Sequence, residues 1–419
     1  MKYILIFNQY HELQKTFGKA IVIHDIVEYD LPSIRMLEED MYLPNANVQD
    51  ICNTIKELRI NYNETAIILL SQNQLPNIDS LISELNTIEI NFIGGIFPGL
   101  IYDSKVYHTG AIILIMPTMQ PPVLIKSISK SSNDLENLID SFEPMSRDNT
   151  TAFIIVDCMS SNISSFLSSL YNRLADSVKY IGCGAGFLDF EQKPCIFTPD
   201  GFFEDAATIC FLDTKCKLGV HHGWERYSGP IIVTKSEGNV IKELNWKNAL
   251  SVYESAIEDD AKKELKMNNF YQISSHYPFG IYIEGHEDII REIFRTNEKG
   301  ELFCAGEVPE NTILNIMKSN KYLLINSAEQ ALEDCLVQEN MEIQHCFVID
   351  CIGRAIFLQN YFDEELRAIK NILGLKGINI TTEGVLSGGE IASMNGDMLE
   401  YLSKTIVVGV FHESTDRCM

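Results

Sequence analysis

Short apolar runs recur along the chain, and each is followed by a segment in which apolar residues return with helical spacing. Three runs rich in branched side chains lie at 66–71, 153–158 and 346–351. Such runs are typical of strands that are buried on both faces. The helical spacing follows over 78–85, 163–174 and 366–373, and Asp363 is predicted to cap the last of these helices.

A second strand follows each helix and leads into glycines, and a further strand completes the unit. The glycines stand at 94–95, at 182 and 184, and at 388–389, and the closing strands cover 111–116, 206–212 and 405–411. Because glycine permits a positive φ and a close backbone approach, these turns are either tight connections or binding sites. The pattern predicts an α/β fold with mixed α+β layers. Repeated strand–helix–strand–glycine turn–strand units are expected to form two related domains.

The stretch between the second and third units has a different pattern. Two short apolar runs flank residues 236–239, which predicts a hairpin. A helix is expected over 249–257, where apolar residues share one face. We place the domain boundary near residue 220, which gives one domain over 1–220, beginning with a strand at 1–7, and a second over 221–419.

Composition narrows the class of protein. The 419 residues are 46% hydrophobic and 22% charged, and their formal net charge is -25. That charge favours solubility and repels nucleic acid and anionic lipid. The 11 cysteines include no C-x-x-C pair and no zinc-type spacing, which indicates a reducing compartment and no metal site. No apolar stretch reaches the length of a membrane span, about 18 residues. We expect a cytoplasmic protein.

The string 220–225 contains two adjacent histidines, a glycine and a tryptophan. The imidazole of His222 and the indole of Trp224 offer hydrogen bonds and a stacking surface for a small ligand. Because neighbouring side chains of a strand point to opposite faces, His221 and His222 are not expected to share one metal ion. The alternative is a strand end with one buried and one solvated histidine.

Arg354 follows the third buried strand behind a glycine, which is where α/β folds bind ligands. Its planar guanidinium suits a carboxylate. Gly389 and Glu390 place a carboxylate at the glycine turn of the same unit, and Ser403 and Thr405 add hydroxyl groups. Arg354 and Glu390 either pair with each other or receive the two ends of a zwitterion such as an amino acid.

Motifs that mark common enzymes are missing from the sequence. There is no phosphate-binding G-x-x-x-x-G-K-[ST] loop, no G-x-S-x-G nucleophile turn and no H-E-x-x-H zinc helix. We therefore expect no catalytic activity. The alternative is an enzyme in which Glu390 or Asp350 is the general base and Arg354 an electrostatic clamp.

Several strings, taken in order, resemble the FIST family, whose members have an N-terminal and a C-terminal FIST domain. They lie at 219–225, 233–241, 249–253, 350–354, 384–391 and 402–405. The sequence departs from the family pattern at 94–99, which is apolar, and at Ser403, where the family often has asparagine.

The resemblance implies a bacterial or archaeal sensory module that binds a small ligand, either an amino acid or another small carboxylate. The signal is expected to pass to a separate output protein such as a histidine kinase, a chemoreceptor or a diguanylate cyclase. No cofactor is expected. The alternative is a haem-binding nitric-oxide or gas sensor with His221 or His222 as the axial ligand. The predicted ligand-binding residues are His222, Trp224, Lys235, Arg354, Gly389, Glu390, Ser403 and Thr405.

Overall fold

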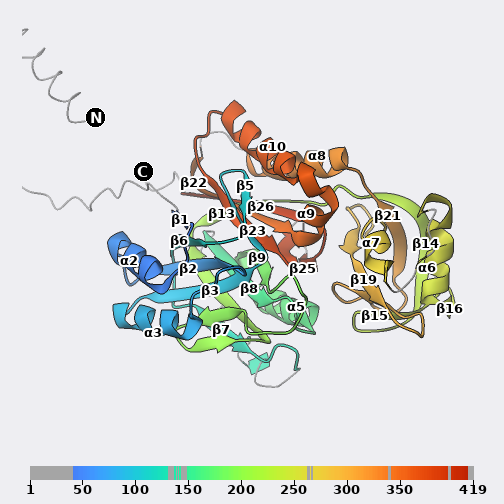
Figure 1. Ribbon diagram of the computed structural model, residues 1–419, viewed down its shortest axis with the longest axis horizontal. Helices are drawn as coiled ribbons and strands as arrows, with labels where there is room; N and C mark the ends of the chain where they lie inside the picture. Colours follow the sequence, from blue (N-terminus) through green and yellow to red (C-terminus); the bar gives the residue numbers. More distant parts are fainter. Residues whose placement is uncertain are drawn as a thin grey trace, which may run out of the picture. The chain divides into compact units, whose positions relative to one another are not determined.

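The computed structural model describes residues 41–413, with gaps at 131–135, 138, 140, 143–148, 262–264, 266–267, 338–340 and 395–397. The strand predicted over 1–7 lies outside these residues. The strands of the described residues form four sheets, and the fourth of these sheets curls into a barrel. Helices lie against each of the four (Figure 1). This is the mixed α/β architecture that the periodicity predicts.

The first sheet has the order β1-β6-β2-β3-β10-β11. Its strands are β1 (Met41–Leu43), β2 (Glu64–Ser71), β3 (Asn91–Phe97), β6 (Ala111–Pro117), β10 (Ile196–Thr198) and β11 (Gly201–Phe203). β2 pairs in parallel with β3 and antiparallel with β6. The helices α2 (Val48–Leu58) and α3 (Ile78–Ile88) lie side by side against this sheet (Figure 1).

The second sheet has the order β25-β24-β9-β8-β12-β7. Its strands are β7 (Val123–Lys126), β8 (Thr150–Asp157), β9 (Lys179–Ala185), β12 (Ala206–Asp213), β24 (Glu390–Met394) and β25 (Met398–Leu402). β8 again pairs in parallel with the strand after its helix and antiparallel with the closing strand. The helix α5 (Ile163–Leu174) covers it and continues into the short helix η1 (Ala175–Ser177).

The third sheet has the order β13-β26-β22-β23-β4-β5. Its strands are β4 (Gly99–Tyr102), β5 (Lys105–Tyr107), β13 (Lys215–His221), β22 (Glu342–Cys351), β23 (Thr382–Ser387) and β26 (Ile406–Glu413). The helices α8 (Lys321–Cys335), α9 (Ile352–Leu358), η2 (Gln359–Tyr361) and α10 (Phe362–Leu375) lie against it. At Gly219 of β13, the backbone of α8 comes so close that an added Cβ would stand 1.7 Å from the Ala331 carbonyl oxygen.

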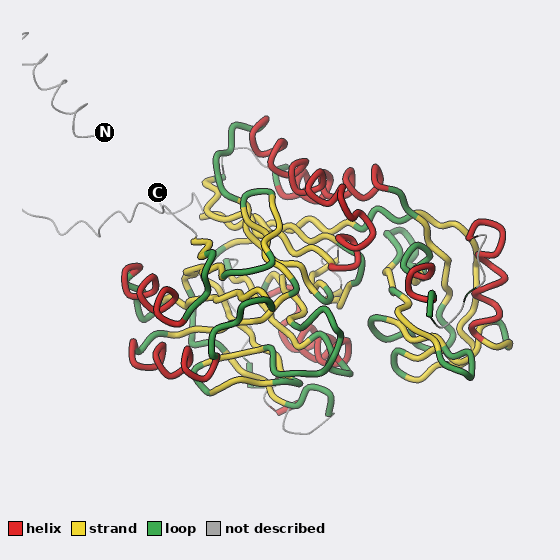
Figure 2. Tube along the Cα trace, in the orientation of Figure 1, coloured by secondary structure: helices red, strands yellow, loops and turns green. Residues whose placement is uncertain are grey.

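The fourth sheet is an almost closed barrel of order β18-β17-β21-β14-β15-β20-β19, with β16 paired to β15. Its strands are β14 (Glu225–Glu237), β15 (Val240–Leu244), β16 (Lys247–Asn248), β17 (Phe279–Ile281), β18 (Ile289–Arg291), β19 (Ile293–Thr296), β20 (Leu302–Cys304) and β21 (Ile313–Lys318). Only Glu292 separates β18 from β19, so the two ends of the order meet there. The helices α6 (Ala249–Ala261) and α7 (Phe270–Ser274) lie beside the strands of this sheet (Figure 2) and share its separate apolar core.

One apolar cluster takes in side chains of the first three sheets, which explains why their central strands are buried on both faces. The rings of Phe153 in β8 and Phe347 in β22 meet edge to face, with centroids 5.5 Å apart. Within the described residues, no helix is both long enough and apolar enough to cross a membrane.

Most of the elements predicted from the sequence are confirmed. The three buried runs are β2, β8 and β22, the helical segments are α3, α5 and α10, and β14 and β15 form the predicted hairpin. Asp363 does not cap a helix: α10 follows η2 directly, its N-cap position is Tyr361, and Asp363 lies in its first turn. Residues 352–358, which directly follow the third buried run and contain Arg354, form α9.

Strands are exchanged between the two halves of the chain. β4 and β5, from the N-terminal half, extend the third sheet through β23. β24 and β25, from the C-terminal half, extend the second sheet through β9. The division at residue 220 into two related domains stays a prediction, because sheet membership crosses it in both directions.

Candidate ligand-binding site

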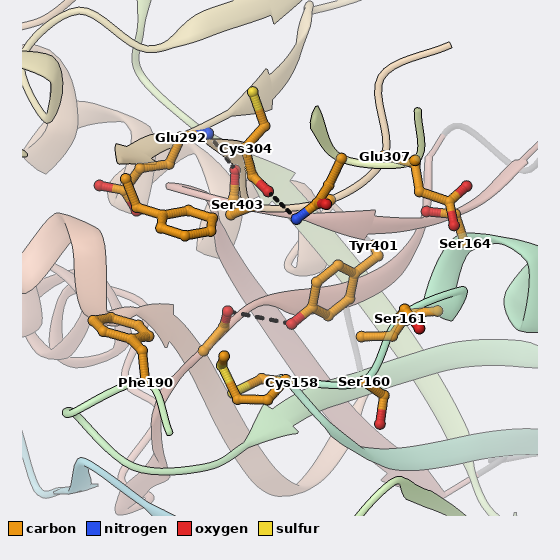
Figure 3. A pocket seen from close by; sticks show the side chains of 18 of the residues that line it. Cys158, Ser160, Ser161, Ser164, Phe190, Glu292, Cys304, Glu307, Tyr401 and Ser403 are labelled. Carbon is orange, nitrogen blue, oxygen red and sulfur yellow. Dashed lines mark hydrogen bonds between the residues drawn. The ribbon is translucent and has the colours of Figure 1, made fainter. Parts of the chain in front are cut away.

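A cavity of about 350 Å³ opens between the second sheet and the barrel. Segment 158–164 and the hairpin turn at 238–239 form part of its wall. The rest comes from barrel residues at 292–294 and 304–307 and from residues around the glycine turn at 388. Figure 3 shows Cys158, Tyr401, Ser403 and Glu307 around this space. The site therefore joins segments that are far apart in the sequence.

Aromatic and small polar side chains make up much of the wall. Phe190, Tyr271, Phe294 and Tyr401 supply the rings. Ser161, Asn162 and Ser164 come from the start of α5, where the Asn162 side chain makes no capping hydrogen bond to the helix. Apolar walls with a few converging polar groups are typical of sites for small organic molecules.

Two carboxylates, Glu292 and Glu307, line the cavity. Glu292 is buried and accepts from Lys404 Nζ at 2.7 Å and from the Tyr271 hydroxyl at 3.0 Å, both at Oε1. The carboxylate of Glu307 has no hydrogen bond or ion pair in the part of the chain that the structure describes. Burial raises the pKa of Glu307, and the guanidinium of Arg291 opposes that shift.

The glycine turn after β23 forms one edge of the cavity through Gly388 and is hydrogen-bonded to Gly184 of β9. The Gly184 amide donates to the Gly389 carbonyl at 2.7 Å, and the Gly388 amide donates to the Gly184 carbonyl at 2.9 Å. A Cβ at Gly389 would stand 2.3 Å from the Tyr401 ring. Gly389 thus lets Tyr401 pack against the turn, and Gly388 is the glycine that lines the cavity.

Arg354 lies outside this cavity, fully buried in α9. Its guanidinium pairs with Asp350 at 3.2 Å and with Glu365 at 3.0 Å. It also donates to the His222 carbonyl at 2.6 Å and to the Leu324 carbonyl at 3.0 Å. All of these partners are protein groups, so the arginine is occupied in linking its own helix α9 to β22, α8, α10 and the segment that follows β13.

Glu390 and Thr405 meet each other rather than the cavity. Glu390 is fully buried in β24, and its Oε2 accepts from the Thr405 amide at 3.3 Å. The other oxygen, Oε1, has no partner among the described residues, and burial raises the pKa of this carboxyl well above its usual range. Arg354 forms its ion pairs with Asp350 and Glu365 and none with Glu390.

His222 and Trp224 are buried at the start of the barrel segment. The Trp224 amide donates to His222 Nδ1 at 2.8 Å, and the Trp224 indole donates to the Lys404 carbonyl at 3.3 Å. Neither side chain lines the cavity. Lys235 lies on β14 with its side chain 56% exposed, and its Nζ is 3.9 Å from Glu243. Of the predicted residues, Ser403 is the one that the cavity wall contains.

His221 is held between two acids. Its Nδ1 is 2.9 Å from Glu287, and its Nε2 is 2.9 Å from Asp334 of α8. The buried His222 beside it matches the alternative of a strand end with one buried and one partly solvated histidine. An axial haem ligand needs a free ring nitrogen facing a cavity. Both ring nitrogens of His221 lie 2.9 Å from carboxylates, and the buried His222 Nε2, 3.4 Å from Glu287, makes no hydrogen bond within the described residues. Neither histidine lines the cavity.

The acid contacts of His221 predict a pH dependence. The hydrogen bond to Glu287, opposed by burial and supported by Asp334, raises the pKa of His221 above 6.5. Because the folded-state pKa is the higher one, this stabilisation is complete below the unfolded value and is lost as the pH rises through the folded value. We expect His221→Gln to destabilise the protein more at pH 5.5 than at pH 8.5, measured by urea unfolding. An equal loss at both pH values would contradict this.

The residues that sequence reasoning missed are mainly Glu292, Glu307 and the segment 158–164. The segment directly follows the buried strand β8, and the rule that ligands bind beyond the carboxyl ends of parallel strands points to it. Glu292 and Glu307 stand in no motif. In the described part of the chain, no cluster of three or more His, Cys, Asp or Glu side chains is arranged to hold a metal ion.

Comparison with known proteins gives two matches in order along the chain. The family model for the FIST N domain matches residues 123–247. The family model for the FIST C domain matches residues 249–393. A search of curated proteins found no match. The cavity wall takes residues from both matched segments, and from Tyr401 and Ser403 beyond them.

Proposed function

Because the chain belongs to the FIST family, with a FIST N domain followed by a FIST C domain, we propose that it is a sensory module whose ligand binds in the 350 Å³ cavity. FIST domains are regarded as sensory and signalling modules, and neither match is to a catalytic family. One observation carries the proposal: the cavity wall is shared by both FIST segments. A ligand there contacts both, and its binding energy can change how they meet.

The ligand expected from the family resemblance is an amino acid or another small carboxylate. An amino acid is supported in one respect, because its ammonium group can face Glu307. We propose that the bound state is read by a separate output protein such as a histidine kinase. The shared strand order around β2, β8 and β22 supports the interpretation that the sheets arose from repeated units. The haem alternative has no such support, since His221 and His222 are engaged by other groups.

Thermal unfolding in the presence of candidate ligands tests the site. A ligand present at 100 times its Kd is expected to stabilise the protein by about 2.7 kcal/mol. Ser164→Phe, at the start of α5, fills the cavity and should abolish the shift in melting temperature. Ser165→Phe is the matched control, because Ser165 is exposed on the same helix and outside the cavity wall.

The proposal fails if ligands still shift the melting temperature of Ser164→Phe, or if Ser165→Phe loses the shift equally. A haem titration completes the test. A Soret band that appears with the wild-type protein and is lost in His221→Ala would show that haem binds at the histidines instead of a ligand in the cavity. Affinity capture with the intact protein, with and without ligand, tests whether the output partner responds to binding.

A further inference from the structure

We propose that the cavity recognises a small organic amine in its cationic form, and that the ammonium group rather than a carboxylate is the required part of the ligand. This inference rests on the proposed sensory function and names the ligand class of the same site. It is argued from the charge of the wall, from the state of its carboxylates and from its rings.

The charged side chains that line the cavity are all acidic. Among the described residues of its wall, Glu292 and Glu307 carry charge, and there is no lysine, arginine or histidine. A ligand carboxylate would therefore meet no basic side chain, while it would lie near two acids. Transfer of an unpaired anion into such a site is unfavourable, whereas a cation gains a partner.

Glu292 and Glu307 differ in what neutralises them. Lys404 is buried and pairs with Glu292, so that pair is neutral as a whole. The Arg291 guanidinium is 3.7 Å from Glu400, and its Nε donates to the Glu307 backbone carbonyl at 3.0 Å rather than to the side chain. The Glu307 side chain is thus the carboxylate at the cavity that the described residues leave without an ion pair.

The groups around the wall also disfavour negative charge. Asp157 directly before Cys158, and Glu390 near Tyr401 and Cys351, are buried carboxyls whose pKa values burial raises. Burial raises the pKa of the Cys158 thiol to about 12, and the neighbouring Asp157 carboxyl adds to that shift. Burial also raises the pKa of Tyr271, and the Glu292 carboxylate adds to that shift. Burial therefore disfavours an anion at these positions of the wall.

The rings of the wall suit the rest of an organic cation. Phe190, Phe294, Tyr271 and Tyr401 line the same space as the two carboxylates. Aromatic faces attract ammonium groups and also bury the apolar body of an amine. Figure 3 shows Glu292 and Glu307 on opposite sides of the view with the Tyr401 ring below them, and all three residues line the cavity.

Calorimetric titration of the full chain with matched probes tests the inference. The amines are 2-phenylethylamine and cyclohexylamine. The matched compounds are 3-phenylpropionate and 2-phenylethanol for the first, and cyclohexanecarboxylate and cyclohexanol for the second. We expect at least one amine to bind and its carboxylate and alcohol counterparts to bind at least tenfold more weakly. Glu307→Gln should weaken amine binding by about ten- to one-hundredfold, the usual loss for a hydrogen bond to a charged group. Glu298→Gln is the control, because Glu298 is exposed and outside the wall.

Two results would overturn the inference. One is binding of a carboxylate that equals or exceeds that of its matched amine and that Ser164→Phe abolishes; the proposed sensory site would then stand without the amine. The other is amine binding that Glu307→Gln leaves unchanged while the variant unfolds like the wild type. If no probe of either charge binds, and no ligand shifts the melting temperature, both the proposed ligand-binding site and the preference for amines are contradicted.

Discussion

Replacing Arg354 with methionine is expected to lower the free energy of unfolding by about 3–5 kcal/mol, the usual cost of breaking a buried ion pair by removing one partner. Asp350 and Glu365 would stay buried without their counter-charge. Burial already raises the pKa of Asp350 well above its usual range, and Glu365 adds to the shift. The backbone carbonyls of His222 and Leu324 would also lose a donor.

Urea unfolding at pH 7, followed by tryptophan fluorescence, measures this loss. Arg367→Met is the matched control, because Arg367 is exposed on α10 and should change stability by no more than about 0.5 kcal/mol. A loss of under about 1 kcal/mol in Arg354→Met would show that the buried acids are not held by this arginine. Arg354 would then be free for the ligand role that the sequence predicts.

The second large effect is expected at Gly219, where β13 passes under α8. An added Cβ would meet the carbonyl oxygen of Ala331 at 1.7 Å and its Cα at 2.8 Å. Because these are backbone atoms, no side chain can turn away and the helix itself must shift. We expect Gly219→Ala to lower the free energy of unfolding by about 1–3 kcal/mol or more. In contrast, Gly374→Ala in α10 meets no atom within 4 Å and should be neutral or stabilising by up to about 1 kcal/mol.

A double-mutant cycle links the two predictions. α8 carries Leu324 and Ser327, which accept hydrogen bonds from Arg354, so a shifted α8 weakens the same network that Arg354→Met removes. The combined loss should therefore be smaller than the sum of the two single losses by at least about 0.5 kcal/mol. Strict additivity would show that the clash at Gly219 is absorbed without moving α8.

The sequence predicts the strands and helices of this protein well because their periodicity is local. The runs that became β2, β8 and β22 are apolar on both faces, and the helices after them keep one apolar stripe. The pairing of β24 with β9 and of β4 with β23 joins residues that are far apart, and no local pattern encodes it. The place where the sheets meet could not be predicted for that reason.

The predicted site shows the same limit. The position of Arg354 after a strand end predicts a ligand-binding residue, but its partners Asp350 and Glu365 come from β22 and α10. The spacing of Asp350 and Arg354 is four residues, and this signal could have indicated an internal pair. Glu307 could not have been found, because its role depends on which side chains are absent from a wall assembled from distant segments.

The exchange of strands between the halves also limits which gene recombination events can yield a folded protein. A fragment ending at residue 220 would keep β4 and β9 but lose β23 and β24, their partners. The complementary fragment would keep β23 and β24 with their edges exposed, and unpaired strand edges promote aggregation. Recombination that separates the halves therefore yields two chains that each lack part of a sheet, so the FIST N and FIST C segments are expected to be transmitted as one gene segment.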